Sequence, residues 1–301
     1  MPLVATRTEQ WATDDGDELV LHRLDAPSGV TPMPPRLLVL HGLEGTIHSH
    51  YVRGMLQQAL RRGWAADVLI FRGCGPQMNR RPRMYHSGET SDLDFVVHRL
   101  LRENPHQPLV LAGFSLGGNV MLKWLGEQGS RLAAQVRAAA AISVPFDLEG
   151  GSRQVEHGFS RLYTRHFLRT LKVKARAKLR QFPSLFSETR LDQARTLYEF
   201  DDAVTAPMHG FESAHHYYSA SSSLQYLPAV DRPTLLIAST DDPFLSARAR
   251  DGVAMVSRVN EALAVELHSS GGHVGFVSGW NPFRARYYAE ERAMEFLAGW
   301  I

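Results

Sequence analysis

The pentapeptide Gly113-Phe114-Ser115-Leu116-Gly117 constrains this chain of 301 residues more than any other feature. An apolar, strand-like run precedes it, and an amphipathic segment with helical spacing follows it. A nucleophile elbow needs this strand–turn–helix context: its turn is so tight that both glycines must lack side chains, and it pushes the serine out above the strand. The pentapeptide alone is a weak signal, because at about 7% glycine it arises by chance in roughly one chain of this length in ten. Its flanks and its distant partners therefore decide the interpretation.

Short apolar runs alternate with helical patterns through the first half of the chain. Residues 8–25 have the turn and the partial alternation of a β-hairpin. Further strands are expected at 36–40, at 65–71, in the run that ends at Ser115 and at 138–144, with helices at 51–62, from about 91 and after Ser115. This alternation predicts an α/β fold with a mainly parallel, doubly wound sheet. Ligands bind beyond the carboxyl ends of the strands in such sheets, where Ser115 is expected to lie.

The alternation stops after Pro145 and resumes only with the apolar run 234–238. We interpret residues 147–225 as a helical cap that is inserted within a single α/β domain spanning residues 1–301. After the cap we expect a helix near 246–258, a strand at 264–267 and a closing helix from about Arg284 to Ile301.

A serine hydroxyl becomes nucleophilic only when a base takes its proton, and an acid must hold that base in the right tautomer. In sheets of this kind the order along the chain is serine, acid, histidine. Asp241 and Asp242 follow the strand 234–238, and His273 follows the strand 264–267. Both groups should therefore reach the same sheet edge as Ser115.

Asp241 and Asp242 compete for the role of the acid. In similar loops of this fold the acid commonly lies four positions before a proline, and Ser246 fills that place here for Asp242. This spacing favours Asp242. The other aspartate is then expected to stabilise the turn by accepting hydrogen bonds from backbone amides.

The negative charge of a tetrahedral intermediate needs hydrogen-bond donors. One is the backbone N–H of the residue after the nucleophile, Leu116, and the other should come from the loop after the first buried strand. Residues 41–45 form that loop, which makes the amide of Leu43 the expected second donor. We interpret His41 as a residue that braces this loop rather than as a catalytic base.

Five separated motifs occur in an order that resembles the YheT-like (AB hydrolase 4) branch of the α/β-hydrolase superfamily, esterase-type proteins of bacteria that are related to eukaryotic phospholipase-like hydrolases. The motifs are His41-Gly42-Leu43-Glu44-Gly45, Tyr85-His86-Ser87-Gly88-Glu89-Thr90, Gly113-Phe114-Ser115-Leu116-Gly117-Gly118-Asn119, Asp241-Asp242-Pro243-Phe244 and Gly272-His273-Val274-Gly275. The resemblance covers nearly the whole chain. It implies an α/β-hydrolase fold, carboxylic-ester hydrolysis and a catalytic triad of Ser115, Asp242 and His273. The eukaryotic relatives carry an N-terminal membrane anchor, which is not visible in this sequence, so membrane residence is not inferred.

These residues predict a cofactor-free serine hydrolase that cleaves acyl or lipid-like esters through an acyl-enzyme. Acyl transfer to an alcohol or thiol on the same triad stays an alternative, because the choice of acceptor depends on the shape of the pocket. A non-catalytic binding protein is a second alternative, although such members usually lose a triad residue. Acyl chain length, head group and oligomeric state are not decided by the sequence.

Composition excludes several other classes. The net charge of +2 is too small to indicate a nucleic-acid partner. The single cysteine, Cys74, cannot form an internal disulfide, and neither a secretory signal nor a membrane span is visible, so a cytoplasmic location is expected. The histidines near residues 48–50 and 209–216 lack a third ligand at metal-like spacing, so no metal site is expected. Residues 161–180 carry eight Lys or Arg and no acid, which we interpret as a solvated helix face, with peripheral contact to anionic lipid as the sharper alternative.

Overall fold

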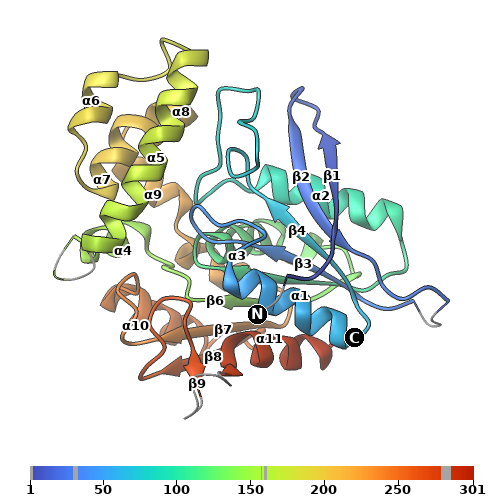
Figure 1. Ribbon diagram of the computed structural model, residues 1–301. Helices are drawn as coiled ribbons and strands as arrows, with labels where there is room; N and C mark the ends of the chain where they lie inside the picture. Colours follow the sequence, from blue (N-terminus) through green and yellow to red (C-terminus); the bar gives the residue numbers. More distant parts are fainter. Residues whose placement is uncertain (1–2, 30–32, 157, 159–160, 279–285) are drawn as a thin grey trace.

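The computed structural model describes residues 3–29, 33–156, 158, 161–278 and 286–301, and shows an eight-stranded sheet flanked by helices (Figure 1). The strands are β1 (Arg7–Ala12), β2 (Glu18–Leu24), β3 (Arg36–Leu40), β4 (Ala65–Ile70), β5 (Leu109–Phe114), β6 (Val136–Ile142), β7 (Thr234–Ser239) and β8 (Leu263–His268). A separate two-stranded ribbon pairs β9 (Val277–Ser278) with β10 (Arg286–Tyr287). The helices are α1 (His50–Arg61), α2 (Ser91–Glu103), α3 (Leu116–Gln128), α4 (Leu148–Gln154), α5 (Arg161–Gln181), α6 (Glu188–Gln193), α7 (Leu197–Phe200), α8 (Ala206–His209), α9 (Ala214–Ser221), α10 (Ala247–Val256) and α11 (Tyr288–Ala298). Short 3₁₀ segments, η1 (Gly129–Arg131) and η4 (Ser223–Ala229), follow α3 and α9, and a π-helical turn, η3 (Asp201–Thr205), joins α7 to α8.

The strand order is β1-β2-β4-β3-β5-β6-β7-β8, and every neighbouring pair from β4 to β8 is parallel. The hairpin β1–β2 adds antiparallel strands at one edge. Helices α1 and α11 lie in front of the sheet in Figure 1, and α2 and α3 lie behind it. The predicted mainly parallel, doubly wound α/β fold is therefore confirmed.

The sheet core follows from this layering. Every residue of β3, β5 and β7 is buried, because a parallel strand inside the sheet is covered by helices on both faces. The edge strands β1 and β8 are largely half-buried or exposed. The central strands therefore hold the loops at their carboxyl ends on a rigid base.

The helices α4 to α9 come between β6 and β7 in the chain and form a group of their own beside the sheet (Figure 1). This group has its own apolar cluster, whose members include Leu168, Leu171, Leu191, Phe200 and Val204. We call α4–α9 the inserted helices. Residues 157, 159 and 160 of the predicted cap lie outside the described residues.

Three features differ from the expectations. The predicted closing helix from Arg284 begins only at Tyr288, residues 286–287 form β10 instead, and Arg284 lies outside the described residues. The strand predicted at 138–144 occupies Val136–Ile142, because the pairing with β5 ends before the turn that begins at Ser143. The expected solvated face of α5 is only partly solvated, since Lys178 is fully buried and Lys174 is half-buried against the sheet side of the molecule.

Candidate active site

Ser115 sits in a strained turn between β5 and α3. Its φ of 52° and ψ of −118° lie in a region that non-glycine residues seldom adopt. Its amide donates to the carbonyl of Ile142 at 2.8 Å, which fixes the turn against β6. A Cβ on Gly113 would lie 2.7 Å from Cα of Gly118, and one on Gly117 would run into the carbonyl oxygen of His41. The expectation that both elbow glycines must lack side chains is confirmed.

The structure brings Ser115, His273 and Asp242 together in one hydrogen-bonded line. The Ser115 Oγ lies 2.8 Å from Nε2 of His273, and Nδ1 of His273 lies 3.0 and 2.9 Å from the two carboxylate oxygens of Asp242. A carboxylate only accepts, so the proton of the neutral ring is assigned to Nδ1 and Nε2 is left to accept from the serine. Asp242 is buried, and its Oδ1 also accepts from the amide of Phe244 at 2.8 Å. This arrangement can deprotonate Ser115.

Asp241 contacts the same loop in a different way. Its carboxylate accepts from the amides of Gly272 at 2.8 Å and Gly271 at 3.4 Å, and from Oγ of Ser239 at 2.6 Å. The hydrogen bond from Ser239, followed by that from the Gly272 amide, lowers the pKa of Asp241 below its usual value. Asp241 thus holds the backbone that carries His273, the turn-stabilising role expected for the second aspartate.

The loop after β3 brings Leu43 to the same place. The amide of Gly45 donates to the carbonyl of Gly42 at 3.0 Å and closes a turn, in which Glu44 has a left-handed φ of 57°. The amide of Gly42 donates to the hydroxyl of Tyr51 at 3.0 Å. Leu43 and Leu116 both line the cavity above Ser115, and within the described part of the chain neither backbone amide donates to another group. Both residues therefore stay candidates for the oxyanion donors that the sequence predicts.

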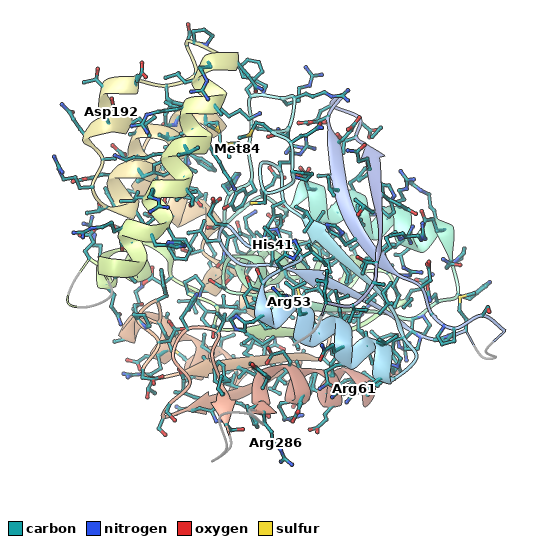
Figure 2. All side chains as sticks on the ribbon, viewed as in Figure 1. His41, Arg53, Arg61, Met84, Asp192 and Arg286 are labelled. Carbon is teal, nitrogen blue, oxygen red and sulfur yellow. The ribbon has the colours of Figure 1, made fainter. Side chains whose placement is uncertain are left out.

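His41 is fully buried and braces this loop, as the sequence predicted. Its Nδ1 lies 2.7 Å from the carbonyl of Gly42, and its Nε2 accepts from the amide of Phe71 at 3.1 Å. Burial lowers its pKa to about 4, so the ring stays neutral at neutral pH. Figure 2 shows His41 near the middle of the molecule, with Met84 on the side of the inserted helices.

A cavity of about 240 Å³ opens above Ser115 and His273, between the sheet and the inserted helices. Apolar side chains from the inserted helices form much of its wall, namely Phe167, Leu171, Leu197, Phe200, Val204 and Met208. Polar groups also line it, including His86 and Asp201. Burial lowers the pKa of His86 to about 4 and raises that of Asp201 to about 6. The cavity can therefore enclose a small, mostly apolar molecule next to the serine.

Several residues that shape this site were not identified from the sequence. Tyr51 holds Gly42, Ser143 accepts from the amide of Val274 at 3.1 Å, and Asp201 accepts from Thr205 and Tyr218. The partner of Ser143 lies far away in the chain, those of Asp201 lie within the inserted segment, and Tyr51 lies nine positions after Gly42, outside the motif of residues 41–45, so no short motif marks them. Ser143 directly follows the buried strand β6, and this position is the one sequence signal that could have identified it.

The described residues hold no cluster of three or more His, Cys, Asp or Glu side chains arranged to bind a metal ion. None of the helices in the described ranges combines the length and the apolar character that a bilayer-crossing segment needs.

Comparisons with known proteins agree with this geometry. A family model described as alpha/beta hydrolase fold matches residues 35–278. The chain is 37% identical to YheT of Escherichia coli (strain K12) over 289 residues, which is 95% of this chain and 83% of YheT. It is 30% identical to the phospholipase ABHD3 of Mus musculus over 291 residues, covering 95% of this chain and 70% of ABHD3. Among solved structures, the Pyrococcus furiosus esterase Pf2001 superposes with a TM-score of 0.62 at 17% identity, over 98% of this chain and 90% of that one, a likeness of fold alone.

Proposed function

Since the chain belongs to the α/β-hydrolase fold family and its YheT-like branch, we propose that it hydrolyses carboxylic esters with Ser115 as the nucleophile, His273 as the base and Asp242 as the acid that orients it. The single observation that carries this proposal is the continuous hydrogen-bonded line from Ser115 through His273 to Asp242 at the foot of the cavity. The relative named phospholipase supports an ester as the substrate.

The proposed reaction has two halves. As Oγ of Ser115 attacks the ester carbonyl, Nε2 of His273 takes its proton, and Asp242 stabilises the imidazolium that forms. The backbone amides of Leu43 and Leu116 donate to the oxyanion of the tetrahedral intermediate. His273 then protonates the leaving alcohol, which leaves the acyl group on Ser115. A water molecule activated by His273 releases the acid and restores the serine.

The substrate we propose is an acyl ester or a lipid-like ester of small size. The apolar side chains of the inserted helices face the serine across the cavity, and they would bury an acyl chain at a gain of about 0.8 kcal/mol per CH₂ group. In this proposal residues 147–225 act as the cap of one α/β-hydrolase domain. The scheme uses no cofactor. The cytoplasmic location expected from the sequence stays a prediction.

Labelling with a fluorophosphonate probe tests the proposal. Wild type should be labelled, and Ser115→Ala and His273→Ala should not. Ser87→Ala is the matched control, because Ser87 lines the same cavity and its hydroxyl has no role in the scheme, so labelling should persist. A p-nitrophenyl ester series from short to medium chains then measures hydrolysis. A folded wild type that neither takes the probe nor cleaves these esters would contradict the proposal and favour a binding protein.

A further inference from the structure

One ion pair joins the inserted helices to the loop that carries Leu43. The Nζ of Lys174, from the middle of α5, lies 2.6 Å from Oε1 of Glu44, the residue directly after Leu43. The two side chains are 21% and 11% exposed, so the pair is largely withdrawn from solvent. A charge contact in such surroundings is screened less than one on the open surface. Helix α5 therefore contacts the loop after β3 through a defined pair of atoms.

Two further side chains surround the pair, and we call Glu44, Cys74, Tyr85 and Lys174 the Glu44 cluster. The hydroxyl of Tyr85 donates to Oε1 of Glu44 at 2.7 Å and accepts from the amide of Glu44 at 3.0 Å. The Sγ of Cys74 lies 3.5 Å from Nζ of Lys174. Burial raises the pKa of Cys74 to about 11 and also raises that of Tyr85, so both are neutral at neutral pH. Lys174 is therefore the cluster's only cation and Glu44 its only anion.

The backbone at Glu44 explains why this cluster matters for Leu43. A left-handed φ at a residue other than glycine is unfavourable and persists only where the surroundings hold it. Here Tyr85 holds Glu44 by both its amide and its carboxylate, and Lys174 neutralises that carboxylate. The Leu43 N–H belongs to the peptide unit between Gly42 and Leu43, whose carbonyl accepts from the amide of Gly45 in the turn that contains Glu44. The direction of the Leu43 N–H therefore depends on the contacts that hold Glu44 in this turn.

A second lysine shows that α5 is fixed to the sheet side of the molecule rather than resting loosely above it. Lys178, one helical turn after Lys174, is fully buried and donates to the carbonyls of Asn79 and Arg81. Residues four apart share one face of a helix. The face of α5 that carries Lys174 and Lys178 is therefore turned toward the loops of the sheet.

We propose that Lys174 is a positioning residue, which holds the Leu43 amide in place through Glu44 and so links helix α5 to the stabilisation of the oxyanion. This inference rests on the proposed function, because it assigns Leu43 as an oxyanion donor. It makes the turnover rate depend on where the inserted helices sit, even though Lys174 does not touch the reacting atoms.

The variant Lys174→Met tests this link, because methionine keeps most of the side-chain volume and removes the charge. The Glu44 carboxylate would then be left without its cation, and the loop should turn to expose it to water. Removing a whole oxyanion donor typically costs about 10²–10³-fold in kcat, so a misdirected one should cost at least about tenfold, with KM changed less than about twofold. The Ki of a trifluoromethyl ketone, whose serine adduct carries an oxyanion, should rise by the same factor. A merely structural role would not move that Ki in step with kcat.

Three further variants complete the test. Lys172→Met is the matched control: Lys172 is on the same helix, but its Nζ contacts the carbonyl of Asp192 on the outer side, so kcat and Ki should stay at wild-type values. Lys174→Arg keeps the charge and should recover most of the activity. In a Glu44→Gln background no carboxylate needs neutralising, so the Lys174→Met change should cost less than about threefold.

The measurements distinguish a failure of this inference from a failure of the proposed function. If wild type is active and Lys174→Met leaves kcat and the ketone Ki unchanged, or if the loss is the same in the Glu44→Gln background, this inference is wrong and the proposed function stands. If wild type itself takes no probe and cleaves no ester, the proposed function fails first. If the Lys174→Met protein does not fold, the double variant with Lys174→Met and Glu44→Gln is compared with the Glu44→Gln single variant. A single variant that is more than about threefold as active as the double variant overturns the inference.

Discussion

Two adjacent carboxylates, Asp241 and Asp242, face the same histidine loop and contact it differently. The carboxylate of Asp242 contacts the imidazole of His273, whereas that of Asp241 contacts the backbone amides of Gly271 and Gly272. The distinction is one of geometry, since the side chains are chemically identical. It determines what each should contribute to the proposed reaction.

The substitution Asp242→Asn should nearly abolish ester hydrolysis. An asparagine can present its NH₂ group to Nδ1 of His273, which favours the tautomer that cannot accept the serine proton. In a triad of the same kind such a change lowers kcat by about 10⁴-fold, and we expect a loss of about 10³–10⁴-fold here. Steady-state kinetics with a p-nitrophenyl ester would measure it.

Asp241→Asn is the matched comparison. It keeps one oxygen acceptor for the amides of Gly271 and Gly272, so we expect a loss of less than about tenfold in kcat. If the two substitutions had equal effects, or if Asp241→Asn were the worse, the assignment of Asp242 as the acid would be wrong.

At the level of elements, helix α3 connects Ser115 to the inserted helices. The side chain of Asn119, a residue of this helix, is fully buried and makes three hydrogen bonds outside the helix. Its Nδ2 donates to the backbone carbonyls of Ser87 and Ser221, each at 2.8 Å. Its Oδ1 accepts from the backbone amide of Ser223 at 3.0 Å. These contacts fix the loop around Ser87 and the end of α9 against the start of α3.

Asn119→Ala should therefore destabilise the protein strongly for a single polar residue. It removes the Asn119 partner from three backbone groups, through two buried hydrogen bonds and one part-buried one, at about 1–3 kcal/mol each before relaxation, and we expect a net loss of about 3 kcal/mol in the free energy of unfolding. Chemical denaturation would measure it. Gln128→Ala is the control on the same helix, because Gln128 is only half-buried and donates one hydrogen bond to Asp94, and it should cost about 1 kcal/mol or less. Equal losses for the two variants would contradict the conclusion that Asn119 fixes these segments against α3.

The elements themselves were largely predictable, because apolar runs and helical spacing report directly on burial. The buried strands β3, β4, β5 and β7 lie within a residue or two of their predicted positions. The order of Ser115, Asp242 and His273, after β5, β7 and β8, was visible for the same reason. The ribbon β9–β10 was not predicted, since strands of two residues are too short to show a period.

Contacts between residues that lie far apart in the chain could not be predicted from the sequence. The basic stretch 161–180 was interpreted as a solvated face, yet Lys174 and Lys178 contact loops about 130 and about 100 positions away. A lysine that pairs with a half-buried carboxylate and one that faces water look the same in a composition count. Likewise, nothing near Asn119 in the sequence marks the distant segments that it holds.

At the scale of the whole molecule, a helix from the first quarter of the chain packs against the last helix. Helix α11, near the C-terminus, packs on α1 in front of the sheet (Figure 1). Glu290 of α11 is 2% exposed at this contact, where a Cβ on Gly54 of α1 would lie 3.0 Å from its Cγ. Among the described residues, nothing bonds to Oε1 of Glu290. Burial raises the pKa of Glu290 to about 7.

This carboxyl should make the free energy of unfolding fall as the pH rises. In the unfolded chain Glu290 ionises near its ordinary pKa of about 4.5, whereas in the fold it keeps its proton up to about pH 7. Between these values the folded state binds more protons, so stability is lost as pH rises through this window and then levels off. Glu290→Gln removes the titration, and we expect it to be near neutral at pH 4.5 and to stabilise the protein by about 2–3 kcal/mol at pH 8. Urea denaturation at both pH values would measure the difference. Glu295→Gln is the control, because Glu295 is exposed on the same helix. A Glu290→Gln effect that is the same at pH 4.5 and pH 8 would show that the carboxyl titrates normally in the fold.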